Sequence, residues 1–195
     1  PLEGTLDMGG ASLPFTASSR GHYFEAPFDI PLAGVASADD YVARLRGQHV
    51  LVDYESRREM IVDAASTLAE SNGVELRAND TLLDEITGLV EWPTPLFGEI
   101  EDRFMALPDE VLEASIRIHQ KYLTTANGDG RLTAGFVVVS NRLSDLQRNA
   151  VILAGNQRVL RSRLADAEFF WQEDRQSPLE DSLPALQDIV FYEGL

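Results

Sequence analysis

The chain has 195 residues, of which 44% are hydrophobic and 25% are charged, and its formal net charge is −16 at pH 7. This composition is that of a soluble globular protein with a hydrophobic core, and the length fits one large domain or two small ones. There are no cysteines, no secretory signal and no apolar run of the ~20 residues that a membrane helix needs, which excludes disulfides and predicts a cytoplasmic protein without a membrane partner.

The first part of the chain is predicted to form short strands and one helix. Residues 4–19 have the pattern of two strands around the turn signal Gly9-Gly10. Ser37 stands before an alanine and two aspartates, a typical helix start, and this helix is expected to stop at Gly47. The apolar segment HVLVD that follows, residues 49–53, predicts a buried strand.

Two helices and an edge strand are predicted next. An amphipathic helix over residues 54–71 is closed by Asn72-Gly73, and a second helix runs from about residue 80 to residue 90. The segment EWPTPLFGEI breaks the second helix at Pro93 and continues as a strand, which its prolines place at the edge of a sheet. The side chains expected to point inward from the second helix are Leu82, Leu83, Ile86, Leu89 and Val90.

The second half of the chain combines helices with one hairpin. LPDEVLEASIRIHQ begins a helix with acidic residues in its first turn. In KYLTTANGDGRLTAGFVVVSN, two strands flank Asn127–Gly130, whose residues tolerate the positive φ of a tight hairpin. After Asn141 the chain is predicted to be helical through Leu153, to pause at Gly155-Asn156 and to resume as a helix to about Asp174; the last residues predict a short helix and an apolar tail.

These elements indicate the fold class. Strands and helices are mixed rather than strictly alternating, and no repeat, low-complexity tract or linker divides them. We therefore expect a single α+β domain over residues 1–195, with antiparallel strands and hairpins. Its C-terminal part, about residues 142–195, is expected to be helical.

The charge is unevenly distributed along the chain. From Arg142 to Arg175 there are six arginines and five acidic residues, a balance of +1. Because the net charge of the whole chain is −16, the remainder carries −17. The negative total disfavours nonspecific binding to nucleic acid, which depends on neutralising phosphates. Only this segment can face a polyanion without repelling it. The basic residues are fifteen arginines and Lys121, a bias that codon usage in a GC-rich genome would also produce.

The arginine-rich segment has apolar residues on more than one side. On a helix, one narrow arc collects the side chains expected to be buried, and Arg158 and Phe169 fall on the opposite side. Arg163 and Asp166 are spaced to form a surface pair. The helix is therefore either covered on both sides by protein or presents its outer side to a ligand or an RNA. The expected buried face consists of Leu153, Leu160, Leu164, Ala167 and Trp171.

Two further clusters of polar residues are candidates for a cleft. HQKYL lies at the junction between a helix and a hairpin strand. RGHYF is a tight loop with two side chains, Arg20 and His22, that could donate hydrogen bonds to an anion. The alternative for HQKYL is a histidine that caps the end of its helix. The three histidines have no metal-ligand spacing, and no phosphate-binding or dinucleotide-binding glycine motif is present, so we expect no metal and no cofactor in this chain. The cleft candidates are His119, Gln120, Lys121, Tyr122, Arg20, His22 and Asn156.

Seven segments together resemble one known family. They are RGHYF, DYESRRE, GLVEWP, FMALPDEVLEASIRIHQKYL, FVVVSN, AGNQRVLRSRLADAEFFWQEDR and PLEDSLPALQDIVF, and they look like successive blocks of the bacterial glycyl-tRNA synthetase beta subunit. They cover almost everything from Arg20 to the C-terminus. The chain departs from the family pattern at Leu123, where phenylalanine is usual, and at Gln157, where glutamate is usual. The chain begins without an initiator methionine, which predicts a piece of a longer protein.

The resemblance implies an assembly and a division of labour. Such enzymes are heterotetramers of two alpha and two beta chains, in which the alpha chain uses ATP and Mg to form glycyl-adenylate and the beta chain contributes most of the binding to tRNA(Gly). This chain would be the central part of the beta chain, before its HD-type helical domain. The resemblance also implies a fold like the editing domain of phenylalanyl-tRNA synthetase beta chains, which need not bring an activity.

Three functions follow as alternatives. The first is a non-catalytic module that contacts tRNA and neighbouring subunits. The second is an editing-type deacylase with His119 and Lys121 near the scissile ester. The third is a scaffold whose long helix only joins domains. For the first function, the residues expected to contact tRNA or a neighbouring domain are Arg158, Arg161, Arg163, Phe169 and Arg175, of which the first three would contact phosphates.

Overall fold

The computed structural model describes residues 5–14, 18–176 and 178–186 and has an α+β architecture, as expected. Its strands form two short antiparallel pairs and a four-stranded antiparallel sheet with the order β5-β7-β8-β6. The strands are β1 (Thr5–Met8), β2 (Ala11–Pro14), β3 (Ser18–Arg20), β4 (Asp29–Pro31), β5 (Glu75–Arg77), β6 (Pro93–Glu99), β7 (Leu123–Ala126) and β8 (Leu132–Asn141).

The helices follow the sequence predictions in most places. The C-terminal short helix is confirmed as far as residue 186, and the expected apolar tail lies outside the described residues. The helical segments are α1 (Ala38–Arg46), α2 (Tyr54–Ser71), α3 (Asp80–Leu89), the 3-10 turn η1 (Asp102–Ala106), α4 (Asp109–Glu113), the π turn η2 (Ala114–His119), α5 (Leu146–Asp174), η3 (Leu179–Ser182) and α6 (Leu183–Leu186).

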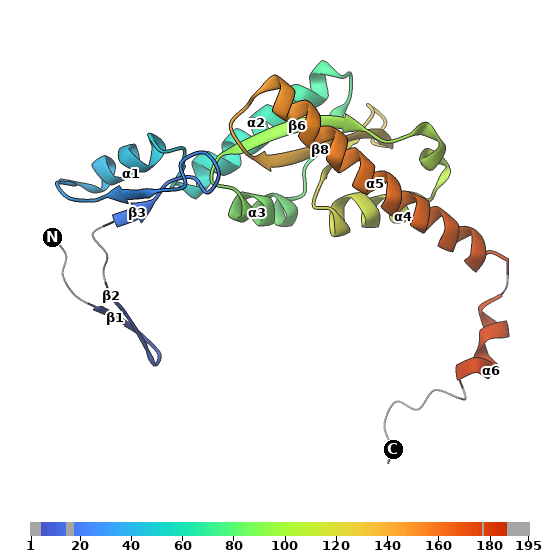
Figure 1. Cartoon of the computed structure of the whole chain (residues 1–195). Helices are drawn as coiled ribbons and strands as arrows, with labels where there is room; N and C mark the ends of the chain where they lie inside the picture. Colours follow the sequence, from blue (N-terminus) through green and yellow to red (C-terminus); the bar gives the residue numbers. More distant parts are fainter. Residues whose placement is uncertain (1–4, 15–17, 177, 187–195) are drawn as a thin grey trace, which may run out of the picture.

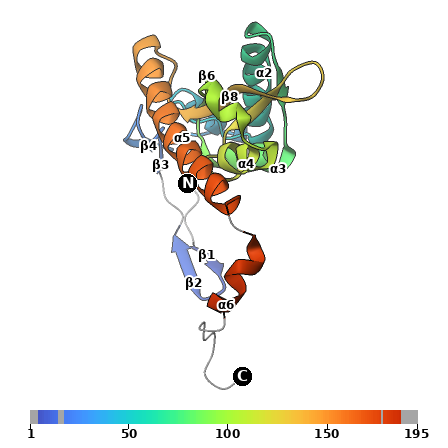
Figure 2. The same cartoon turned by 90° about the vertical axis from the view of Figure 1, so that its right-hand side faces the viewer.

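The four-stranded sheet is covered on both faces by helices (Figure 1 and Figure 2). Along β8, Val137 packs with α2 and α3 on one face, while Phe136 and Val138 pack with α5 and the segment from η1 to η2 on the other. This alternation is the period of a strand, and burial on both faces explains why the run FVVV, residues 136–139, is apolar throughout. The strand β6, with its two prolines, lies at an edge of the sheet, as predicted.

Close packing places α5 against the sheet. A Cβ at Gly98 of β6 would lie 2.8 Å from the ring of Phe136 and 2.9 Å from a methyl group of Leu153. Glycine at this position therefore lets the side chains of β8 and α5 meet directly over β6. Leu160 and Leu164 are fully buried in the same cluster, which confirms the buried face predicted for this helix.

Three local predictions are wrong. Residues 50–53 form no strand, because the N–H of Leu51 donates to the carbonyl of Glu91 and the guanidinium of Arg57 takes the carbonyls of Leu51 and Val52. Leu89 is not inward: it ends α3 and is 66% exposed. The helix does not pause at Gly155-Asn156, because one glycine costs only about 1 kcal/mol in a helix whose neighbours are packed on the core.

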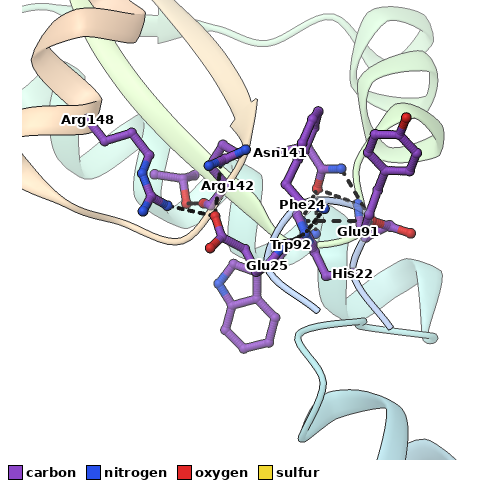
Figure 3. Close-up of polar contacts among 10 residues, drawn as sticks. His22, Phe24, Glu25, Glu91, Trp92, Asn141, Arg142 and Arg148 are labelled. Carbon is purple, nitrogen blue, oxygen red and sulfur yellow. Dashed lines mark hydrogen bonds and ion pairs between the residues drawn. The ribbon is translucent and has the colours of Figure 1, made fainter. Parts of the chain in front are cut away.

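One asparagine fixes the loop of residues 21–28, here called the aromatic loop, to the end of the sheet (Figure 3). Asn141 ends β8, and its Oδ1 accepts hydrogen bonds from His22 Nε2 at 3.0 Å, from the N–H of Glu91 at 2.9 Å and from the N–H of Trp92 at 3.0 Å. The side chain thus joins the aromatic loop, the segment after α3 and the sheet at one atom.

The buried ring of His22 completes this connection. Its Nδ1 accepts hydrogen bonds from the N–H groups of Phe24 at 3.2 Å and Glu25 at 3.1 Å, so the proton of the neutral ring is on Nε2. The Oε2 of Glu91 accepts from the N–H of Tyr23 at 2.9 Å. Every backbone donor from Tyr23 to Glu25 is therefore held by a side chain.

Replacement of Asn141 by alanine should destabilise the protein strongly. The change removes one acceptor from three donors, and each donor left buried without a partner costs about 1–3 kcal/mol. We expect the free energy of unfolding, measured by urea titration, to fall by at least about 2 kcal/mol. Asn149→Ala is the control, since the Asn149 amide donates only to the exposed Ser144 hydroxyl. Equal stability of the two variants would contradict this role of Asn141.

Candidate functional site

The outer side of α5 presents two arginines that have no acidic partner among the residues that the structure describes. The helix begins after Asp145, whose side chain accepts from the N–H of Arg148, and it runs without a break for 29 residues. Arg158 and Arg163 are both exposed, and within the described residues neither lies within salt-bridge distance of a carboxylate. The predicted pair between Arg163 and Asp166 does not form. Two cations of this helix are therefore available to an external anion.

The other two predicted arginines are engaged inside the chain. Arg161 is 59% exposed but forms an ion pair with Glu101 in the turn before η1. Arg103 also donates to Glu101, at 2.9 Å, and pairs with Glu168 of α5 at 3.2 Å. These arginines, Arg103 first, hold the pKa of the Glu101 carboxyl below its usual value. The guanidinium of Arg175 lies over the ring of Trp171, 4.7 Å from its centroid.

Apolar side chains extend this surface toward the end of the helix. Phe169 is 57% exposed and Phe170 is 62% exposed, and their rings are in contact at a tilted angle, with 5.5 Å between centroids. Val151 and Val159 are also exposed. We call the side chains of Arg158, Arg163, Val159, Phe169 and Phe170 the outer face of α5. Exposed apolar groups gathered beside unpaired cations are typical of a contact surface.

The HQKYL cluster does not form a common site. His119 is exposed at the end of η2 and, within the described residues, has no polar partner. Lys121 has a positive φ of 59° and pairs with Glu85 at 3.0 Å. Tyr122 is buried, and its hydroxyl donates to Asn156 Oδ1 at 2.6 Å; burial raises the pKa of this hydroxyl. The structure thus brings Tyr122 and Asn156 together, whereas Lys121 pairs with Glu85 of α3. Gln120 is half-buried.

The two candidates in RGHYF also have separate environments. His22 is fully buried with both ring nitrogens occupied, so its ring is not available to an external substrate. Arg20, at the end of β3, is exposed and lines an open cavity of about 350 Å³. No group of three or more His, Asp or Glu side chains within the described ranges could hold a metal ion. In the same ranges, no helix has the length and apolar character to cross a bilayer.

Sequence reasoning missed a second network beside the aromatic loop (Figure 3). The carboxylate of Glu25 lies 3.0 Å from Arg142 Nε and 2.7 Å from Arg148 Nη1, although the angle at Arg142 is that of an ion pair rather than of a hydrogen bond. The guanidinium of Arg142 also lies over the Phe24 ring, 4.6 Å from its centroid. These partners are more than a hundred residues apart in the chain, so no local pattern indicates them.

The chain matches known proteins over nearly its whole length. Residues 4–195 match the family model described as glycyl-tRNA synthetase beta subunit. Its relatives include proteins named glycine–tRNA ligase beta subunit from Rhodospirillum centenum, with 45% identity over 91% of this chain, from Paracoccus denitrificans, with 41% over 91%, and from Desulforamulus reducens, with 37% over 95%.

The matched region is 24–26% of the length of these relatives, so the chain spans about a quarter of each. The family model extends to the N-terminal residues before Arg20, which the seven sequence blocks do not reach. Both the family model and the relatives support the resemblance that those blocks indicate. The chain belongs to the glycyl-tRNA synthetase beta subunit family.

Proposed function

We propose that this chain is a non-catalytic module of the beta subunit of glycine–tRNA ligase, and that the outer face of α5 contacts tRNA. The observation that carries this proposal is the exposure of Arg158 and Arg163, which have no acidic partner in the described part of the chain. In a chain with a net charge of −16, exposed arginines of this kind create a local positive potential that attracts an anion. Phosphate contacts need only exposed cations, with no precise base-reading geometry.

The distribution of charge supports the same face. Arg161 shares Glu101 with Arg103, so its charge is already offset, and Arg175 is placed against Trp171. The anionic contact therefore depends mainly on Arg158 and Arg163. Phe169 and Phe170 would then contact an unpaired base or a neighbouring domain, because exposed aromatic rings serve both uses.

The geometry supports no catalytic role for the histidines. His119 has no carboxylate or hydroxyl partner within the described residues to orient it, and His22 is enclosed. An editing-type deacylase at His119 and Lys121 would need both groups at one ester, whereas Lys121 pairs with Glu85. The partners proposed for this module are tRNA(Gly), the alpha subunit, which would use ATP and Mg, and a second beta chain in a heterotetramer.

A scaffold function is the second candidate, and the exposure of Phe169 and Phe170 favours it. In that case α5 joins neighbouring domains of the beta chain through its apolar side chains. The two functions make opposite predictions for charge reversal on this helix, since apolar docking does not depend on the arginine charges.

Charge reversal should weaken tRNA binding. In the complete enzyme, Arg158→Glu with Arg163→Glu should lower the affinity for tRNA(Gly) about tenfold or more and reduce the salt dependence of log K by about 1.5–2, because two phosphate contacts are lost. Fluorescence anisotropy over a salt series measures both quantities. Arg131→Glu is the matched control, since Arg131 is also exposed and without an acidic partner within the described residues but lies in the β7–β8 turn.

The scaffold function predicts the reverse result. The double variant would then bind tRNA with unchanged affinity and salt dependence, while Phe169→Ser with Phe170→Ser would lower thermal stability or the yield of assembled enzyme. Size-exclusion chromatography and thermal unfolding distinguish these outcomes. Unchanged tRNA affinity in the arginine variant would therefore contradict our proposal.

The ion pair between Arg161 and Glu101 predicts how the pKa of Glu101 changes when either of its arginine partners is replaced. Because Arg103 and Arg161 depress the folded-state pKa of Glu101, this carboxyl stabilises the fold above its unfolded-state pKa and loses that contribution as pH falls through its folded-state pKa. Arg161→Met should move the pKa of Glu101 upward, and Arg103→Met should move it further. An NMR pH titration of the Glu101 side chain measures the shift. An unchanged pKa in Arg161→Met would show that Arg161 is not held by Glu101.

A further inference from the structure

Beside the aromatic loop, elements from four parts of the chain enclose an open cavity of about 350 Å³. Its floor is apolar and buried, formed by Leu45 of α1, Leu51 and Val90. Its rim carries Val52 and Leu89, both exposed. This volume falls within the range of small-ligand sites. The exposed Leu89, which sequence reasoning placed inside, belongs to this rim.

The cavity is lined by an arginine that forms no ion pair with any residue in the described ranges. Arg20 lines it and has no acidic partner within the described residues. Arg57 also lines the cavity, but its guanidinium is occupied by the carbonyls of Leu51, Val52 and Thr87. The ring of Tyr41 forms part of the same wall. A ligand can therefore place one anionic group at Arg20 and a flat apolar body on the other side chains.

The wall at the end of α3 adds hydrogen-bond acceptors. A helix leaves its last carbonyls without helical partners. The carbonyls of Gly88 and Leu89 would accept from residues 92 and 93 if the helix continued. The N–H of Trp92 donates to Asn141 instead, and Pro93 has no N–H. Gly88 and Leu89 both line the cavity. Acceptors of this kind suit the amino group of a base.

We propose that this cavity binds one unpaired nucleotide of an RNA, with the phosphate at Arg20 and the base against Tyr41 and Leu89. The proposal rests on the proposed function, in which tRNA is the partner, and adds a second contact to it. Next to the cavity, Glu91 joins the cavity wall to the aromatic loop through the N–H of Tyr23. The exposed rings of Tyr23 and Phe24, in edge contact at 4.8 Å, extend the surface available for the next base.

Filling the cavity gives a direct test. A Cβ at Gly88 would meet no atom within 4 Å, and leucine favours a helix more than glycine does, so Gly88→Leu should fold with an unchanged or higher melting temperature. With a labelled short single-stranded oligoribonucleotide as the probe, we expect this variant to bind about tenfold more weakly than the unmodified chain, as expected for one lost base contact. Binding of a fully paired RNA hairpin should be unchanged.

A second pair of variants tests the phosphate contact. Arg20→Ala should weaken binding of the same single-stranded probe, whereas Arg131→Ala, which removes a comparable exposed arginine, should not. Single-strand binding that is unchanged in both Gly88→Leu and Arg20→Ala, with folding intact, would overturn the proposal. So would a variant that assembles poorly with the alpha subunit while binding RNA normally, because the cavity would then be a protein-docking site.

These outcomes are separate from those of the proposed function. The α5 arginine variants remove two cations outside the cavity and are measured with tRNA, whereas Gly88→Leu leaves those cations in place and is measured with the single-stranded probe. If the α5 variants bind tRNA normally and Gly88→Leu still weakens the single-stranded probe, the cavity proposal stands and the α5 proposal fails. If the cavity variants bind normally and the α5 variants do not, the reverse holds.

Discussion

The side-chain oxygen of Asn141 is the interaction on which the arrangement of the surfaces depends. By accepting from the aromatic loop and from two consecutive N–H groups after α3, it sets where the loop stands relative to the sheet. It also engages the N–H of Trp92, which would otherwise be the helical donor to the carbonyl of Gly88 at the end of α3. One polar side chain at the end of a strand thus shapes both the loop and the cavity wall.

The charge of the chain is organised by internal pairing more than by its total. Of the six arginines between Arg142 and Arg175, two hold Glu25, one pairs with Glu101 and one stacks on Trp171. The other two, Arg158 and Arg163, have no acidic partner among the described residues and are open to an external anion. A count of charges along the sequence cannot separate these classes, because the acidic partners Glu25 and Glu101 lie outside the segment.

Where the physics is local, the sequence predicted the structure well. The cap at Ser37, the glycines of the hairpin turn and the period of α5 all act within a few residues, and the helices 38–46 and 54–71 and the hairpin strands are present as expected. The strand predicted for HVLVD is absent because Arg57 and Glu91 form hydrogen bonds with its backbone groups, and this competition depends on tertiary contacts. The same holds for the site: exposure of Arg158 follows from helical period, whereas the enclosure of His22 does not.

The length of α5 has a mechanical consequence. Its 29 residues make an unbroken rod of about 44 Å. Near its first turn Arg148 pairs with Glu25 in the aromatic loop, near its middle Arg161 pairs with Glu101, and its far end carries the two exposed phenylalanines. One helix therefore fixes the distance between the aromatic loop and the exposed phenylalanines, so that a partner seated on both would meet a spacing set by a single rigid element.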